Sequence, residues 1–160
     1  MLRHAPRLAL LTLLALLAAC ASRAPLPAHT PDLGLPLQLH IERLDEPAQW
    51  LLVIQAEGSA LRWSLFDPLG VPLARQRLED GAWQSEGLLP PNPQARELFA
   101  ALLFALTPDA ALAAAYPQAV RAGASRRLGD WQAANTVDSR LELRLGAQHY
   151  MIRTLQGGHH

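Results

Sequence analysis

Apolar and polar residues alternate along much of the first half of the chain, with the period of two that is typical of strands buried on one face. The pattern is clear in residues 37–42 and in residues 61–65. Residues 50–54 are apolar at every position, as in a strand that is covered on both faces. Residues 71–78 and 82–86 resume the alternation, so the pattern predicts a meander of about five antiparallel strands.

After residue 90 the spacing of apolar residues changes from the period of two of a strand to the three-and-four spacing of a helix. Asn92 is a good N-cap, and Pro93 suits the first position of a helix. In residues 95–106 the apolar positions follow a spacing of three and four, which gives one continuous apolar face. A second, alanine-rich helix is expected to open at residues 107–109 and to end at about Tyr116, because a proline follows.

Strand patterns return in the last third of the chain. Residues 126–133 give a weak pattern, whereas residues 141–145 alternate cleanly. Residues 150–155 follow after a short turn, which predicts a closing hairpin, and residues 157–160 are expected to be a frayed tail. About seven or eight strands with two helices between them predict an α+β fold in a single domain, residues 37–156.

The N-terminal stretch carries the strongest signal of all. Two arginines precede an apolar run at residues 8–17, which is too short to span a bilayer, and Leu17-Ala18-Ala19-Cys20 follows. This arrangement resembles a bacterial lipoprotein signal. The resemblance implies removal of residues 1–19, a diacylglycerol thioether on the Cys20 sulfur and an acyl chain on its new amino group. The alternative is an ordinary signal peptide cut after Ala21.

A proline-rich stretch, residues 20–36, separates the cysteine from the first strand pattern. Its composition favours an extended tether, which at about 3.1 Å per residue would reach some 45 Å from a lipid surface. An edge strand at residues 33–35 is the alternative. Ala21 and Ser22 stand where many lipoproteins kept at the inner membrane have an aspartate, so the resemblance implies the periplasmic face of the outer membrane.

The cysteine content of the chain excludes an intramolecular disulfide, and its charge pattern argues against a nucleic-acid partner. Cys20 is the only cysteine, so an intramolecular disulfide is impossible. The chain has 14 basic and 14 acidic side chains, no lysine, and arginines that are scattered singly except for Arg126-Arg127. A nucleic-acid partner is not expected, because the sequence lacks a basic stripe interleaved with aromatic residues.

Residues arranged for catalysis are not apparent. The sequence has no Gly-x-Ser-x-Gly elbow, no histidine pair at i and i+4 and no phosphate-binding glycine loop. His40 and His149 fall on different predicted strands without a marked third ligand. We therefore expect neither an enzyme nor a metal or cofactor site beyond the lipid on Cys20.

Apolar side chains are in excess on both layers of the predicted fold. Trp50, Trp63 and Trp83 fall on strands, and the first helix presents a broad leucine face. Helices packed on such a sheet make either a solid core or a lined cavity, and ordinary core packing is the default for any one of these residues.

Asp67-Pro68-Leu69-Gly70 predicts a β-turn that displays Leu69. Here the chain resembles the LolB family of outer-membrane lipoproteins, in which a strand ends in Asn-Pro-Leu-Gly before a further hairpin and two helices. The resemblance implies a curved antiparallel sheet, a half-open β-barrel, with two helices over its concave face and a cavity for acyl chains. Asp67 and the short stretch before Val137 depart from the pattern and indicate a short, uncharacterised branch.

The resemblance also implies a function and its residues. Leu69 would touch the membrane while acyl chains of a lipid or lipoprotein enter a cavity, brought by a LolA-like periplasmic carrier, and the protein would act as a monomer. Eight residues would line that cavity: Trp50, Ile54, Trp63, Leu65, Leu98, Phe99, Leu102 and Leu103. The alternative is an accessory or scaffold lipoprotein whose cavity is filled and which binds a periplasmic partner.

Overall fold

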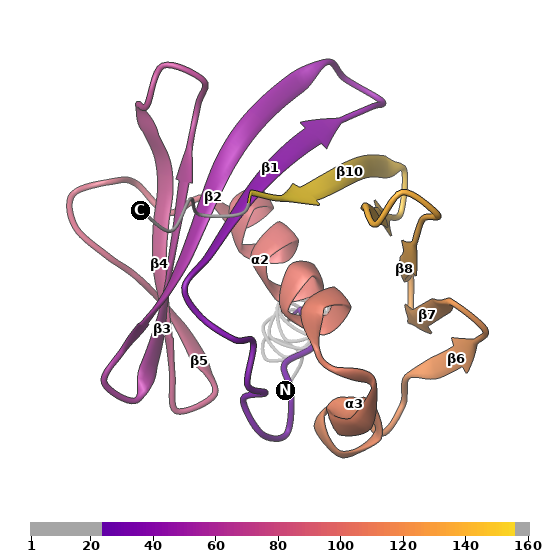
Figure 1. The fold of residues 1–160 in the computed structure, drawn as a ribbon. Coiled ribbons are helices and arrows are strands. Elements are labelled where there is room, and N and C mark those ends of the chain that lie inside the picture. The colour runs from indigo at the N-terminus through magenta and orange to yellow at the C-terminus, as the bar shows by residue number, and fades with distance from the viewer. Residues whose placement is uncertain (1–23, 156–160) are drawn as a thin grey trace, which may run out of the picture.

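A computed structural model describes residues 24–155 as ten strands and two helices (Figure 1). The first five strands are β1 (Leu37–Arg43), β2 (Ala48–Glu57), β3 (Ala60–Phe66), β4 (Pro72–Glu79) and β5 (Ala82–Ser85). Two helices follow, α2 (Pro93–Leu106) and α3 (Asp109–Ala115). The last five strands are β6 (Val120–Ala122), β7 (Ser125–Leu128), β8 (Trp131–Asn135), β9 (Leu141–Leu145) and β10 (Gln148–Thr154).

All ten strands form one antiparallel sheet in the order β5-β4-β3-β2-β1-β10-β9-β8-β7-β6. The first and last strands of the chain meet in its middle, where Leu39 pairs with Thr154 and Ile41 with Ile152. The sheet curls around α2 and stays open between its edge strands β5 and β6 (Figure 1). An α+β architecture with a curved antiparallel sheet is therefore confirmed.

The expected count of seven or eight strands was too low. Where one weak strand was expected at residues 126–133, the structure has β6, β7 and β8. These strands have only three to five residues each, and glycines at positive φ, Gly123 and Gly129, turn the chain between them. Such short segments, rich in arginine and alanine, lack a run long enough to show a period of two.

Helix α2 runs through the concave side of the sheet (Figure 1). Its N-cap is Asn92, whose side chain accepts the Ala95 N–H at 2.9 Å, as the sequence predicts. Nine of its 14 residues are buried, which exceeds the stripe that a helix on a flat sheet would bury. Because the sheet wraps around the helix, most sides of α2 meet apolar side chains.

The segment before β1 lies against the domain. We call residues 24–36 the N-terminal strap. Leu26, Leu33 and Leu35 are partly buried against the core, and the Ala28 N–H donates to the Ala115 carbonyl at the end of α3 at 2.8 Å. The free tether expected for this stretch is thus wrong for its described part, because its spaced leucines find apolar surface. Residues 33–35 are not a strand either.

Several expectations fall on residues outside the described range. These are the signal at residues 1–19, the acylation site Cys20 and the tail at residues 157–160. Among residues 24–155, no helix is long and apolar enough to cross a membrane.

Candidate functional site

The turn between β3 and β4 displays Leu69 to solvent, with 89% of the residue exposed. Asp67 fixes this turn: its Oδ1 accepts the N–H of Leu69 at 2.9 Å and the N–H of Val71 at 2.8 Å. The Asp67 carbonyl accepts the Gly70 N–H at 3.0 Å, and Gly70 has a φ of 82°, which favours glycine. The predicted turn is confirmed. Aspartate can replace asparagine at its first position because both side chains supply an acceptor oxygen.

Further apolar residues lie near this tip. Val71 is 52% exposed directly after the turn, and Leu44 is 43% exposed in the β1–β2 loop. A groove of about 600 Å³ joins this loop to the turn, with Leu44, Trp50 and Pro68 among its lining residues. We call Leu44, Pro68, Leu69 and Val71 the apolar tip.

The groove beside the apolar tip also carries a tight ionic cluster. Arg43 donates to the carboxylate of Asp45 with a shortest contact of 2.8 Å and forms a second ion pair with Glu46 at 3.0 Å. The Asp45 carboxylate also accepts the backbone N–H of His149 at 2.9 Å. The hydrogen bonds from Arg43 and from His149 lower the pKa of Asp45 to about 2. Since acidic groups outnumber Arg43 here, the groove does not favour an anion.

Seven of the eight residues expected to line an acyl cavity are buried in the core. They are Ile54, Trp63, Leu65, Leu98, Phe99, Leu102 and Leu103. The Trp63 and Phe99 ring centroids lie 5.5 Å apart, and the Trp63 and Trp83 centroids lie 5.6 Å apart. Strands β2 and β3 and helix α2 thus bring these side chains together in close contact with one another, as part of the core.

The eighth residue, Trp50, is separate from this cluster. It is half-buried, lines the groove beside the apolar tip, and its ring lies 6.3 Å from that of Tyr150. Neither the groove nor the second pocket, described next, is lined by any of the other seven residues.

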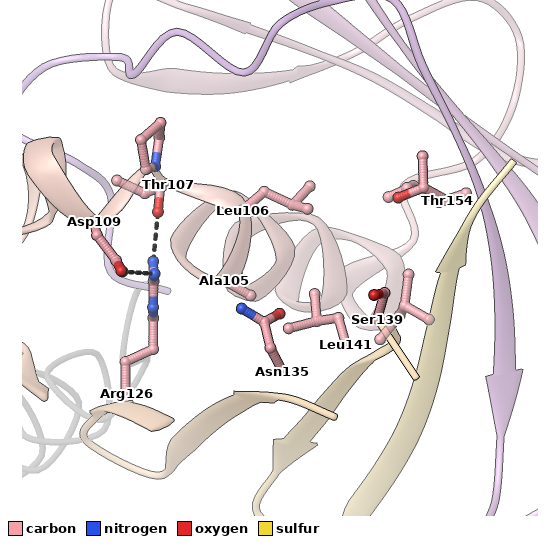
Figure 2. A pocket seen from close by; sticks show the side chains of 12 residues that line it. Ala105, Leu106, Thr107, Asp109, Arg126, Asn135, Ser139, Leu141 and Thr154 are labelled. Atoms are coloured by element: carbon pink, nitrogen blue, oxygen red, sulfur yellow. Dashed lines mark hydrogen bonds and ion pairs between the residues drawn. The ribbon is translucent and has the colours of Figure 1, made fainter. Parts of the chain in front are cut away.

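The second pocket, of about 320 Å³, lies at the C-terminal end of α2 (Figure 2). Five strands that are neighbours in the sheet each contribute lining residues, in the order β1, β10, β9, β8 and β7. Residues 105–109 line its other side. We call it the end pocket. Its apolar residues are Leu39, Ala105, Leu106, Pro108, Leu141 and Ile152, and its polar residues are Thr107, Asp109, Arg126, Asn135, Ser139 and Thr154.

Arg126 closes one side of the end pocket. Its Nη1 donates to the carbonyls of Phe104 and Thr107, and its Nη2 donates to the carboxylate of Asp109 (Figure 2). A cation at a helix C-terminus satisfies carbonyls that have no partner within the helix. Burial lowers the pKa of Arg126. Arg126 therefore acts first as a cap for α2.

The two histidines on strands, His40 and His149, differ in their contacts. His149 contacts Glu142 through its Nε2 at 2.8 Å, whereas His40 makes no such contact with any residue in the range 24–155. Among the described residues, no group of three or more His, Cys, Asp or Glu side chains could hold a metal ion.

No pattern in the sequence indicates the end pocket. Asn135 ends β8, Ser139 lies in the β8–β9 loop, and Thr154 ends β10, 15 residues further along the chain. The pairing of β8 with β9 and of β9 with β10 brings these three residues to one place. By contrast, the turn motif was sufficient to find Leu69.

Comparison with known proteins places the chain in a family. No curated protein and no solved structure matches it. The profile of DUF3261, a family described as proteins of unknown function, matches residues 37–154, from the start of β1 to the end of β10. The matched region covers the whole sheet and both helices but not the N-terminal strap. The chain belongs to the DUF3261 family.

Proposed function

We propose that this protein is a lipoprotein anchored through Cys20 to the periplasmic face of the outer membrane, and that it helps to transfer a lipid or lipoprotein into that membrane. In this proposal the domain has a LolB-like fold and role: it binds an acyl chain and contacts the bilayer through the apolar tip. It is not an enzyme. The cargo would come from a LolA-like periplasmic carrier.

The observation that carries this proposal is the display of Leu69. A leucine side chain gains about 1.5–3 kcal/mol when it leaves water for an apolar phase, and exposed apolar residues that cluster mark contact surfaces more than single ones do. The two hydrogen bonds from backbone N–H groups to Asp67 hold the turn in this exposed form. Val71 and Leu44 extend the apolar surface around it.

The attachment to the membrane would not depend on the apolar tip alone. Each buried methylene of an acyl chain adds about 0.8 kcal/mol, and two or three chains on Cys20 would make the anchor durable. The contribution of the apolar tip would then be to insert locally at the moment of transfer, not to hold the protein at the surface.

The first test replaces Leu69 with glutamate. Leu69→Glu should leave the unfolding midpoint unchanged, because the side chain contacts solvent, but should reduce association of the unacylated chain with vesicles of anionic and zwitterionic phospholipid. We expect a loss of about tenfold or more in the partition coefficient, since a buried charge replaces a buried leucine. Vesicle flotation measures this directly.

Leu88→Glu is the matched control, because Leu88 is also a fully exposed leucine, in the loop before α2. It adds the same charge at a site outside the apolar tip and should bind vesicles like the wild type. Equal vesicle binding by all three proteins would remove the apolar tip from the proposal.

An accessory or scaffold lipoprotein is the second candidate. Its support is the close packing of Trp63, Phe99 and Leu102, each with no exposed surface, where the LolB resemblance implies a cavity. Native mass spectrometry of the chain purified from a bacterial periplasm, with Cys20 replaced, separates the two. A co-purified lipid supports the carrier, whereas a clean apo mass that does not increase with added acyl ligand supports the scaffold.

A further inference from the structure

The end pocket combines apolar side chains with three polar side chains that have no hydrogen-bond partner among residues 24–155. Leu39 and Ile152, two of its lining residues, are buried, and Leu106 of α2 faces Leu141 across the pocket (Figure 2). The side chains of Asn135, Ser139 and Thr154 make no hydrogen bond to another residue in the range 24–155. Six of the 12 lining residues are apolar and six are polar, so the pocket can contact both an apolar chain and a polar head group.

The polar groups come from two sides of the pocket. Asn135 ends β8, Ser139 lies in the loop that joins β8 to β9, and Thr154 ends β10 (Figure 2). Together they offer one amide and two hydroxyls, which can donate and accept hydrogen bonds but carry no charge. A ligand that matches them has hydroxyl or ester groups.

The loop holds Ser139 in an uncommon conformation. Its φ is 59°, in the left-handed region that side chains other than glycine and asparagine rarely adopt. Thr136 supports this form: its carbonyl accepts the Ser139 N–H at 3.1 Å, and its hydroxyl oxygen accepts the Arg140 N–H at 3.1 Å. Backbone conformations of this kind concentrate at ligand sites, where they fix a side chain.

The charged residues of the pocket do not offer a free cation to an anionic head group. Arg126 is bound to two carbonyls and to Asp109, as described above. Asp109 also pairs with Arg121 at 2.6 Å, so the one carboxylate is shared by two arginines. Arg121 lies outside the pocket lining with about half of its side chain exposed, where water and salt screen its charge.

The size of the pocket limits the ligand further. A volume of 320 Å³ is at the lower end of the range of about 300–1,000 Å³ that small-molecule sites occupy. It suits one chain and a small head group, and it cannot enclose all the chains of a diacylated or triacylated lipid.

We propose that the end pocket binds a single-chain lipid with an uncharged, hydroxyl-bearing head group, such as a monoacylglycerol. The acyl chain would lie along Leu106 and Leu141, and the glycerol would bond to Asn135, Ser139 and Thr154. This inference rests on the proposed lipid handling and names the chemical class of one ligand and its site.

Competing ligands with one acyl chain test the head-group preference. The mature chain with Cys20→Ser is titrated calorimetrically with monolauroylglycerol and with laurate, each below its critical micelle concentration. The wild-type pocket should bind the monoglyceride about tenfold more tightly, since a carboxylate would enter without a free cation. Equal affinities, or tighter laurate binding, would overturn the assignment.

Two substitutions test whether the head group binds at these hydroxyls, and neither introduces a larger side chain. Thr154→Val removes a hydroxyl and keeps the side-chain shape. Ser139→Gly removes the second hydroxyl at a φ that glycine adopts freely, so it should fold at least as well as the wild type. Each should lose most of the preference for the monoglyceride and leave laurate binding unchanged. Monoglyceride binding that both variants retain at wild-type strength would place the head group elsewhere.

Leu69→Glu, in the same titration, separates this inference from the proposed function. It should bind the monoglyceride like the wild type, because Leu69 does not line the end pocket. If no acyl ligand binds while Leu69→Glu still weakens vesicle association, the pocket assignment is wrong and the membrane contact stands. If the ligand binds as expected and Leu69→Glu has no effect on vesicles, only the membrane contact fails.

Discussion

Asp45 illustrates how an acidic turn residue acquires a structural role from distant parts of the chain. As part of an Asp-Glu pair followed by proline, it would be expected to be simply solvated. In the structure its carboxylate accepts hydrogen bonds from Arg43, two residues away, and from the backbone N–H of His149, 104 residues away. It thereby connects the β1–β2 hairpin to the start of β10.

The lowered pKa of Asp45 predicts a pH-dependent contribution to stability. Its pKa falls from 3.8 to about 2 in the folded protein, so the folded state favours the ionised form. The contribution is therefore present above about pH 4 and is lost as pH falls toward 2. Asp45→Asn should lower the urea midpoint at neutral pH, and the gap to the wild type should close in that acidic window.

Wild type and Asp45→Asn are compared at each pH. Both proteins contain all the other carboxylates, so the effect of those groups cancels in the difference between the two midpoints. A gap between wild type and Asp45→Asn that persists unchanged at pH 2 would contradict the assigned role of the Asp45 carboxylate.

At the scale of elements, the C-terminal end of α2 depends on a strand that is distant in sequence. The helix lacks basic residues in its last turn, and Thr107 caps it by donating its hydroxyl to the Leu103 carbonyl at 2.7 Å. Arg126 of β7 then supplies the cation that the helix itself lacks. This contact also ties α2 to the short strands of the β6 edge.

We expect Arg126→Ala to lower the free energy of unfolding by about 1–3 kcal/mol, because it leaves carbonyls of residues 104 and 107 with one donor fewer in a partly buried site. Arg127→Ala is the matched control: the adjacent arginine is exposed, and its loss should change stability by less than about 0.5 kcal/mol. Urea denaturation monitored by circular dichroism measures both. Equal effects of the two substitutions would show that Arg126 does not cap α2.

At the scale of the whole molecule, the N-terminal strap changes how the domain would sit relative to an anchor. The proline-rich composition favours a long tether, yet residues 24–36 pack against the core and α3. Only four peptide units then separate Cys20 from the strap, a reach of about 14 Å when fully extended. While the strap stays packed, a lipid on Cys20 would hold the α3 end of the domain close to the bilayer, and the apolar tip, at the other end of the sheet, would reach that bilayer only after the strap leaves the core (Figure 1).

Removing the strap should destabilise the domain even though the family match begins after it. A chain that starts at Leu37 would expose the apolar surface beneath Leu26, Leu33 and Leu35 and lose the hydrogen bond from Ala28. We expect it to unfold at least about 1 kcal/mol more easily than a chain that starts at Ala24. Equal thermal and urea midpoints for the two chains would show that the strap adds nothing to stability.

The sequence by itself determined the elements whose signals are local. The period of two fixed the long strands, the spacing of apolar residues with an Asn cap fixed α2, and Asp67-Pro68-Leu69-Gly70 fixed the turn that displays Leu69. Each of these depends on backbone chemistry within a few residues, so a single sequence is enough to predict them.

Tertiary structure alone decided the features that depend on contacts between distant residues. The pairing of β1 with β10 created the end pocket, and the wrapping of the sheet around α2 made the residues expected at a cavity into a packed core. The short strands β6 to β8 and the packed strap likewise depend on surfaces supplied by other elements. Burial and pairing are properties of the assembled sheet, and a local pattern does not contain them.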